Sequence, residues 1–427
     1  MNSPSRSPFE VRMKGFASRT LVADAVRWVD DQASRCGEER IAVASAFGRI
    51  LAQDIISPMD VPGFDRSAMD GYALRGEETE GAGPYNPLPL KIIGESLPGR
   101  EFSGEVTTGT AVRIMTGAPI PRGADAVLPA EFAEEKEKTL ICNAAVPTGK
   151  NVSRRGEDVV TGSTVWKSGR SLRPQDLGLM SSLGIAEVNV ARQPRVRIFI
   201  TGSELVAPGQ PLGPHQIYEA NSSMLAALVH RDRGIVESTL FVGDDKEQLR
   251  NSLTEAGAEV VLISGGSSVG KEDFAPSIVA EEGDLPIHGV AMRPSSPAGI
   301  GRVGEKLVFL LPGNPVSCLC AYDFFAGRAI RRLGGRSADW PYRTVQRPLS
   351  RKIASAIGRV DYCRVKMDAA GVEPLAISGA AILSSTTRAD GFVIVPQDLE
   401  GYPVGANITV FLYDDMHSYD PQSQIEV

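Results

Sequence analysis

The feature that most constrains the fold is a regular alternation of apolar and helical segments between about residues 195 and 335. The apolar runs lie at 196–200, 235–242, 259–264, 287–292 and 307–311, and the helical stretches lie at 221–231 and 246–256 and begin near 274 and 316. Strands that alternate with helices of this length are typical of βαβ units, in which the strands form a largely parallel sheet. We therefore predict a parallel α/β sandwich domain at residues 191–335.

The rest of the chain differs from this segment, and 427 residues are too many for one hydrophobic core. Residues 20–56 show helical spacing, and we group them with 149–190 as a small discontinuous helical and linker domain. Residues 57–148 have short apolar stretches broken by Pro and Gly, which predicts a β-rich domain. Residues 336–427 are predicted to form a C-terminal β-barrel-like domain. Its strands are expected at 343–349, 360–367, 372–377, 392–395 and 408–412.

Charge, hydropathy and cysteine use exclude several classes of protein. With 45 Lys and Arg against 52 Asp and Glu, the chain lacks the basic surplus needed to bind nucleic acid. Its apolar runs are far shorter than the ~20 residues that span a bilayer. The five cysteines are scattered, which suits the cytoplasm, and the first residues lack the pattern of a secretory signal, so residues 1–19 are expected to be a flexible leader.

A glycine-rich loop follows the strand predicted at 259–264. The sequence SGGSSVGKEDF (264–274) predicts a turn that leads into a helix, and glycine backbone N–H groups at such a turn can approach a phosphate closely. A nucleotide-binding P-loop would need Ser or Thr where Glu272 stands. A nucleophile elbow at Ser268 would need a histidine, but His288 follows too soon and His417 lies near the terminus. A turn without a ligand is the third interpretation.

Acidic residues follow the ends of three predicted strands, at the edge where open parallel sheets bind ligands. They are Glu204, Asp244, Asp245 and Asp273. Carboxylates suit Mg²⁺, whereas four histidines without paired Cys or His spacing give a zinc site little to be built from. Asp245 and Asp273 also suit helix N-caps, a role compatible with metal binding. A further rigid turn, LPGNPVS (311–317), joins a buried strand to a helix.

Several long motifs together resemble the MoeA / gephyrin E-domain family of molybdopterin molybdotransferases. The resemblance runs in order from about Arg19 through nearly the whole chain. Its motifs are VPGFDRSAMDGYAL, RIMTGAPIPRGADAVLPAE, RRGEDV, PGQPLGPHQIYEAN, SGGSSVGKEDF and LPGNPVS.

The resemblance implies a fold, a reaction and partners. It implies a homodimer of four-domain subunits, whose α/β domain resembles the MogA adenylyltransferase. The implied substrates are adenylylated molybdopterin and molybdate: the enzyme cleaves the pyrophosphate bond with Mg²⁺, releases AMP and inserts molybdate at the dithiolene sulfurs. Only one segment has the βαβ pattern, so we expect a separate MogA-like adenylyltransferase to supply the ligand.

The resemblance also implies roles for individual residues. The residues with implied catalytic roles are Asp70, Thr116, Glu204, Asp244 and Asp273. The residues expected to bind the metal are Glu204, Asp244, Asp245, Asp273 and Asp158. Ligand binding falls on Gly265, Gly266, Ser267, Ser268, Pro312, Asn314, Pro315 and Ser317. In the terminal domain, Arg364, Ser384 and Ser385 match the stretches that face the oxyanion, and the guanidinium fork suits a tetrahedral dianion.

Two segments depart from the family pattern. Ser203 replaces an acidic residue beside Glu204, which would weaken or rearrange the metal site. Arg293 and Ser296 stand where many members have two lysines, so one cation becomes a hydroxyl; Arg293 is expected to clamp an anion. Two other functions stay open: a non-catalytic ligand-binding or scaffold protein with the same fold, and a P-loop-like phosphotransferase.

Overall fold

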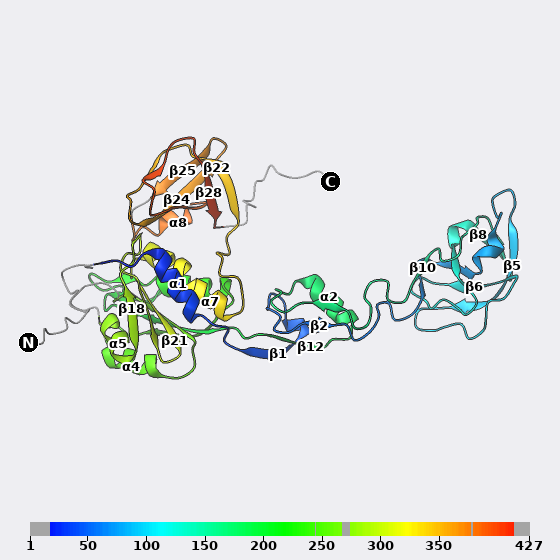
Figure 1. The fold of residues 1–427 in the computed structure, drawn as a ribbon, viewed down its shortest axis with the longest axis horizontal. Coiled ribbons are helices and arrows are strands. Elements are labelled where there is room, and N and C mark those ends of the chain that lie inside the picture. The colour runs from blue at the N-terminus through cyan, green and yellow to red at the C-terminus, as the bar shows by residue number, and fades with distance from the viewer. Residues whose placement is uncertain (1–17, 244, 267–273, 377–378, 414–427) are drawn as a thin grey trace, which may run out of the picture. The chain divides into compact units, whose positions relative to one another are not determined.

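The computed structural model describes residues 18–243, 245–266, 274–376 and 379–413 and divides the chain into two units (Figure 1). Unit 1 contains the described residues up to Glu38 and those from Ala191 onward, and unit 2 is Glu39–Val190. None of the helices in the described part of the chain could span a lipid bilayer. Unit 1 is thus built from two segments that are separated in the sequence by the whole of unit 2.

The centre of unit 1 is a six-stranded sheet in the order β16-β13-β17-β21-β20-β18. The first four strands are parallel, as predicted, whereas β20 pairs antiparallel with both β21 and β18. The strands are β13 (Arg195–Ile200), β16 (Ile235–Phe241), β17 (Val260–Ser264), β18 (Asp284–His288), β20 (Gly299–Val303) and β21 (Lys306–Leu311). Strand β20 is not predicted by the sequence because Gly299 and Gly301 weaken its strand signal. They fit here because a Cβ on Gly301 would lie 2.3 Å from the Asp284 carbonyl oxygen.

Successive residues of the central strands point to opposite faces of this sheet, and both sets are apolar. Both faces are therefore covered by helices. Val196 and Ile198 of β13 pack on one core, and Phe199 packs on the other. The first core is covered by α3 (Asn221–Arg231), α6 (Pro315–Ala321), the π-helix η4 (Tyr322–Ala326) and α7 (Gly327–Leu333), and the second by α4 (Lys246–Thr254) and α5 (Ala275–Glu282). A short parallel pair, β14 (Leu205–Val206) and β15 (Ile217–Tyr218), lies between β13 and α3 in the chain.

Helix α1 (Val22–Gln32) corrects part of the domain prediction, because it packs in the α/β core and not with residues 149–190. Its buried Val22, Ala25 and Val29 belong to the same core as α7, and Arg328 of α7 donates to Asp30 from both Nε and Nη2 at 2.7 Å. The second helical segment expected near Ile41–Leu51 is also wrong. The chain there forms β1 (Glu38–Ala42), which pairs with β12 (Glu187–Ala191), and a 3₁₀ turn, η1 (Val43–Ser45).

The C-terminal part of unit 1 is a β-sheet in the order β19-β24-β26-β28-β22, with β25 beside β24. Its strands are β19 (Met292–Arg293), β22 (Thr344–Pro348), β24 (Val360–Asp368), β25 (Gly371–Ala376), β26 (Gly391–Val395) and β28 (Asn407–Leu412), with a small ladder of β23 (Ile353–Ala354) and β27 (Gly401–Tyr402) and a short helix α8 (Ser384–Thr387). All five strands predicted for this segment are present. Strand β19 explains why 287–292 is not one strand: the chain leaves the α/β sheet at His288 and joins the terminal sheet at Met292.

Unit 2 contains a second six-stranded sheet, in the order β7-β4-β6-β5-β9-β8. Its strands all fall within the segment predicted to be β-rich. They are β4 (Gly71–Leu74), β5 (Leu88–Ser96), β6 (Thr110–Ile114), β7 (Ala126–Pro129), β8 (Ala133–Lys136) and β9 (Thr139–Cys142), with 3₁₀ turns η2 (Gly76–Thr79) and η3 (Ala130–Phe132). The rest of unit 2 has α2 (Pro174–Ser182) and small ladders formed by β2 (Ile55–Ile56), β3 (Arg66–Ser67), β10 (Val152–Ser153), β11 (Thr164–Trp166) and β12 (Glu187–Ala191).

Candidate functional site

A cavity of about 560 Å³ opens at the carboxyl ends of the parallel strands of unit 1. We call it the glycine-turn cavity, because the turns after β17 and β21 line it. The end of β13 contributes Thr201 to Leu205, and the region around the start of α3 contributes Glu219 to Asn221. Of the predicted ligand-binding residues, it collects Gly265, Gly266, Pro312, Asn314 and Pro315. The sheet edge expected to hold the ligand does have a cavity.

Gly265 is required by the geometry of this cavity. Its φ is +91°, and a Cβ there would lie 2.5 Å from the carbonyl oxygen of Thr201. Its N–H donates to Leu311 O at 3.1 Å, which joins the turn after β17 to the end of β21. A side chain at Gly265 would therefore both strain the backbone and push the ends of β13 and β17 apart.

Asn221 connects the turn after β17 to the turn after β21, and it is not among the residues predicted from the sequence. Its Nδ2 donates to Ser264 Oγ at 2.9 Å and to Gly313 O at 2.8 Å. The side chain is buried, and its Oδ1 has no hydrogen-bond partner among the described residues. The preceding Glu219 is also buried, and it accepts hydrogen bonds from the backbone N–H and hydroxyl of Ser222 in the first turn of α3. The motif PHQIYEAN contains both residues, but nothing in its spacing indicates these contacts.

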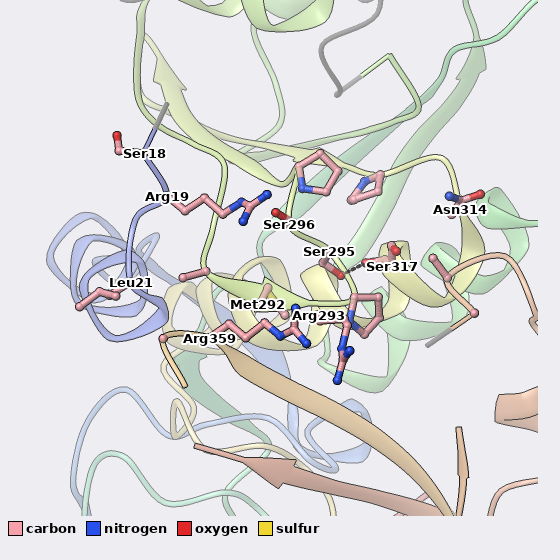
Figure 2. Close-up of a pocket in the computed structure, with 17 residues that line it drawn as sticks. Ser18, Arg19, Leu21, Met292, Arg293, Ser295, Ser296, Asn314, Ser317 and Arg359 are labelled. Atoms are coloured by element: carbon pink, nitrogen blue, oxygen red, sulfur yellow. Dashed lines mark hydrogen bonds between the residues drawn. The ribbon is translucent and has the colours of Figure 1, made fainter. Parts of the chain in front are cut away.

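A second cavity, of about 630 Å³, lies on the other side of the Pro312 turn. We call it the arginine cavity, because Arg19, Arg293 and Arg359 line it (Figure 2). Pro297, Pro312 and Asn314 line both cavities. The other predicted residues in its wall are Ser296 and Ser317. The residues predicted to bind the ligand thus divide between two cavities that share one turn.

Arg293 is already engaged by a carboxylate, which modifies the expectation that it clamps an anion by itself. Its Nε donates to Asp361 Oδ1 at 3.2 Å, and its Nη2 donates to Asp361 Oδ2. Asp361 is fully buried and also accepts from Ser355 Oγ at 2.7 Å, while Arg359 Nε lies 3.1 Å from its Oδ1. Asp361 therefore fixes two of the three arginines in the wall of the cavity.

The serines of this cavity differ in their partners. Ser295 has φ +86° and donates from Oγ to Ser317 O at 2.5 Å. Ser296 Oγ is buried and has no hydrogen-bond partner among the described residues. A buried hydroxyl without a partner is costly unless a ligand or water satisfies it, so Ser296 is available to a ligand.

Two of the three predicted residues of the terminal domain are buried. Arg364 is completely buried, and its Nε donates to Ser385 Oγ at 3.1 Å. Ser385 is buried and donates to Ile382 O, whereas Ser384 is exposed at the start of α8. None of the three is among the described residues that line the two cavities.

The predicted acidic residues do not form one cluster within the described part of the chain. Glu204 is exposed in the glycine-turn cavity, but Asp245 caps α4 by accepting from Gln248 N at 3.0 Å. Asp158 is exposed in unit 2. The predicted residues Asp244, Ser267, Ser268 and Asp273 lie outside the described residues. Among the residues that are described, no three His, Cys, Asp or Glu side chains are placed to hold a metal ion.

Asp70 and Thr116, two of the predicted catalytic residues, are in contact in unit 2. Asp70 Oδ1 accepts from the Thr116 backbone N–H at 2.7 Å and from its hydroxyl at 2.8 Å. The backbone hydrogen bond, followed by the hydroxyl, lowers the pKa of Asp70 below its ordinary value. Asp70 also lines a small cavity of about 210 Å³ with Arg113 and Glu95.

Three family models match almost the whole chain in order. They are the MoeA N-terminal region (domain I and II) at residues 20–184, a probable molybdopterin binding domain at 197–332, and the MoeA C-terminal region (domain IV) at 346–413.

Relatives of similar length match over most of their sequence. The molybdopterin molybdenumtransferase 2 of Mycobacterium tuberculosis is 35% identical over 91% of this chain and 98% of its own length, and the molybdopterin molybdenumtransferase of Haemophilus influenzae is 33% identical over 87% and 93%. A crystal structure of a molybdopterin biosynthesis MoeA protein from Pyrococcus horikoshii has a TM-score of 0.76, at 32% identity, and covers 93% of this chain and all of its own.

Proposed function

The chain belongs to the MoeA family, and on that premise we propose that it is a molybdopterin molybdenumtransferase that inserts molybdenum during molybdenum cofactor biosynthesis. In its finer form the proposal is the reaction that the motifs imply. Adenylylated molybdopterin binds, its pyrophosphate bond is cleaved to release AMP, and molybdate enters at the dithiolene sulfurs. The enzyme acts in the cytoplasm as a homodimer and receives its pterin substrate from a separate MogA-like adenylyltransferase.

The observation that carries this proposal is the pair of cavities that share the turn at Pro312. The glycine-turn cavity offers closely approachable backbone around Gly265 and Gly266, which suits a phosphate. The arginine cavity offers guanidinium groups, which suit a tetrahedral dianion. A ligand that carries a phosphate at one end and must meet an oxyanion at the other needs two such compartments side by side.

The chain's own residues have positioning roles in this scheme. Asn221 holds the turns after β17 and β21 together and so fixes the backbone that would bind the phosphate. Asp361 orients Arg293 and Arg359, so that little reorganisation is needed when the oxyanion arrives. Asp70 is ionised at neutral pH, because its lowered pKa favours the carboxylate, and it therefore suits metal or cation binding better than proton donation.

Mg²⁺ is part of the proposal, with Glu204, Asp244 and Asp273 as its ligands. When bound, the ion would neutralise charge on the pyrophosphate oxygens. Of these three, Glu204 is the described residue, and it lines the glycine-turn cavity at the side of Gly202. Asp245 stays a candidate ligand, because it caps α4 through Oδ1 alone and capping is compatible with metal binding.

A reconstitution tests the function. The purified chain is incubated with adenylylated molybdopterin, Mg²⁺ and molybdate, and AMP release is followed together with activation of a cofactor-free molybdoenzyme. We expect both, and we expect Glu204→Gln to slow AMP release at least tenfold. Glu247→Gln, an exposed acid on α4 paired with Arg250, is the matched control and should keep the full rate.

The same experiment separates the rival functions. Binding of the pterin without AMP release would identify a scaffold and contradict the enzyme proposal. ATP hydrolysis in the absence of molybdopterin would identify a phosphotransferase.

A further inference from the structure

The three arginines of the arginine cavity come from three separate segments. Arg293 ends β19, and Arg359 precedes β24, which pairs with β19 in parallel register. Arg19 comes from the segment before α1. That segment is held by two backbone hydrogen bonds, from Thr20 N to Gly289 O at 3.0 Å and from Ala291 N to Thr20 O at 2.8 Å. The start of the chain's described part is thus attached to the loop that carries the cavity's other residues, and Figure 2 shows Arg19 extending towards Ser296.

The charge in this cavity is not balanced within its wall. None of the described residues that line it is Asp or Glu. The nearest counterion is the buried Asp361, which contacts Arg293 and Arg359. One carboxylate therefore faces two guanidinium groups, and Arg19 makes no ion pair with any described residue that would balance its charge. A wall with two uncompensated positive charges favours a dianion.

Ser296 gives an independent indication that a ligand binds here. Its Oγ is buried without a partner among the described residues, although the backbone around it is fixed by Val290 N donating to Ser296 O at 2.8 Å. A hydroxyl in this position can donate to an oxyanion oxygen. The chain thus has a hydrogen-bond donor at the place towards which Arg19 extends.

We propose that Arg19 is an oxyanion-binding residue: it supplies the third cation of the arginine cavity and, with Ser296, takes the place of the second basic residue that the segment Arg293–Pro297 lacks. The ligand class is a tetrahedral dianion, with molybdate as the substrate. This inference rests on the proposed function for the identity of the dianion. Arg19 contributes charge and donors without a structural role, since its segment is held by backbone hydrogen bonds.

The test is binding of the oxyanion alone, which does not depend on turnover or on a pterin. Isothermal titration of the full chain with molybdate at low salt gives Kd for the wild type, Arg19→Gln and Arg27→Gln. Arg27 lies on α1, exposed and paired with Asp24, and is the matched control. We expect Arg19→Gln to weaken molybdate roughly tenfold, as for loss of a charge-assisted hydrogen bond, and Arg27→Gln to change Kd less than about twofold.

Three further measurements keep the result interpretable. Tungstate should bind with the same dependence on Arg19, Arg19→Lys should restore part of the affinity, and thermal unfolding should not distinguish Arg19→Gln from the wild type. An unchanged Kd in Arg19→Gln, or an equal loss in Arg27→Gln, would overturn the proposal. Phosphate that binds more tightly than molybdate would assign the cavity to the phosphate of the pterin ligand and would also overturn it. Cofactor synthesis, measured separately, decides the proposed function.

Discussion

Asn221 is a buried residue that joins the two turns lining the glycine-turn cavity. Its Nδ2 contacts Ser264 and Gly313, so one buried amide holds the ends of two strands. We expect Asn221→Ala to lower the free energy of unfolding by about 2 kcal/mol, because it leaves buried acceptors without a donor. We also expect a raised KM for adenylylated molybdopterin with a smaller change in kcat.

Urea unfolding and steady-state kinetics of Asn221→Ala measure the two effects. The control is Asn86→Ala, in an exposed turn of unit 2, where Nδ2 donates to Gly81 O. It should change stability by less than about 0.5 kcal/mol. If Asn221→Ala lost stability but kept its KM, the amide would support the fold without shaping the ligand site.

At the same scale, the sequence indicates some site residues and not others for a physical reason. Gly265 and Gly266 are predicted because a glycine turn after a strand is a local pattern. Asn221 and Asp361 are not, because their partners Gly313 and Arg293 lie 92 and 68 residues away in the chain. Spacing cannot reveal that a buried Asp361 already engages Arg293.

At the scale of the element, the turn after β17 depends on the absence of a side chain at Gly265. We expect Gly265→Ala to cost about 3 kcal/mol or more, because it combines a left-handed backbone with a Cβ 2.5 Å from Thr201 O. Gly304→Ala is the matched control, since φ is +57° there but no atom lies within 4 Å of the added Cβ. It should cost about 1 kcal/mol. Equal costs in denaturant unfolding would show that strain alone, without the contact, decides the effect.

Helix α2 has a pH-dependent start. Burial would raise the pKa of Asp176, but hydrogen bonds from Arg170, the Arg173 backbone and side chain, and Trp166 outweigh it and hold this pKa well below its ordinary value of 3.8. The stabilisation is therefore present above pH ~4 and is lost as the pH falls below that value towards the folded-state pKa.

We expect Asp176→Asn to cost about 2 kcal/mol at pH 7, since it removes a buried carboxylate that accepts hydrogen bonds from charged groups, and to cost progressively less below pH ~4. Unfolding of both proteins by urea across pH 3–7 measures this. Asp31→Asn, at an exposed position of α1, should show no comparable pH dependence. A cost that stayed constant down to pH 3 would contradict the lowered pKa.

Periodicity explains why most elements of unit 1 are predictable and why a few are not. The buried parallel strands are short continuous apolar runs, and α3 is predicted with the bounds that the structure has, Asn221–Arg231. Strand β20 is not predicted because two glycines occupy it. Strand β1 is not predicted because its residues do not alternate between polar and apolar, and its partner β12 lies far along the chain. The packing of α1 against α7 is a contact between segments about 300 residues apart, and no local sequence pattern indicates it.

At the scale of the whole molecule, Trp340 connects the α/β core to the terminal sheet of unit 1. Its ring contacts Phe324 of η4 and Phe411 of β28, both at 4.9 Å between centroids, and its Nε1 donates to Asp323 O at 2.9 Å. We expect Trp340→Ala to cost about 3–5 kcal/mol and to separate the unfolding of the terminal sheet from that of the α/β core.

Differential scanning calorimetry measures this separation as an additional transition at lower temperature. Trp340→Phe keeps an aromatic ring and loses the N–H donor, so it should cost less and leave the two parts unfolding together. A Trp340→Ala protein whose calorimetric trace kept its number of transitions would show that other contacts suffice to couple the two parts.

The packing of α1 also has a consequence for synthesis of the chain on the ribosome. Residues 39–190 are complete as unit 2 before any strand of the six-stranded sheet of unit 1 has been made. Helix α1 is made first, yet Val22, Ala25 and Val29 are covered only when residues up to Leu333 have emerged. For the time needed to translate about three hundred residues, at roughly 5–20 residues per second, this apolar stripe has no native surface to cover it and is a natural target for nascent-chain chaperones.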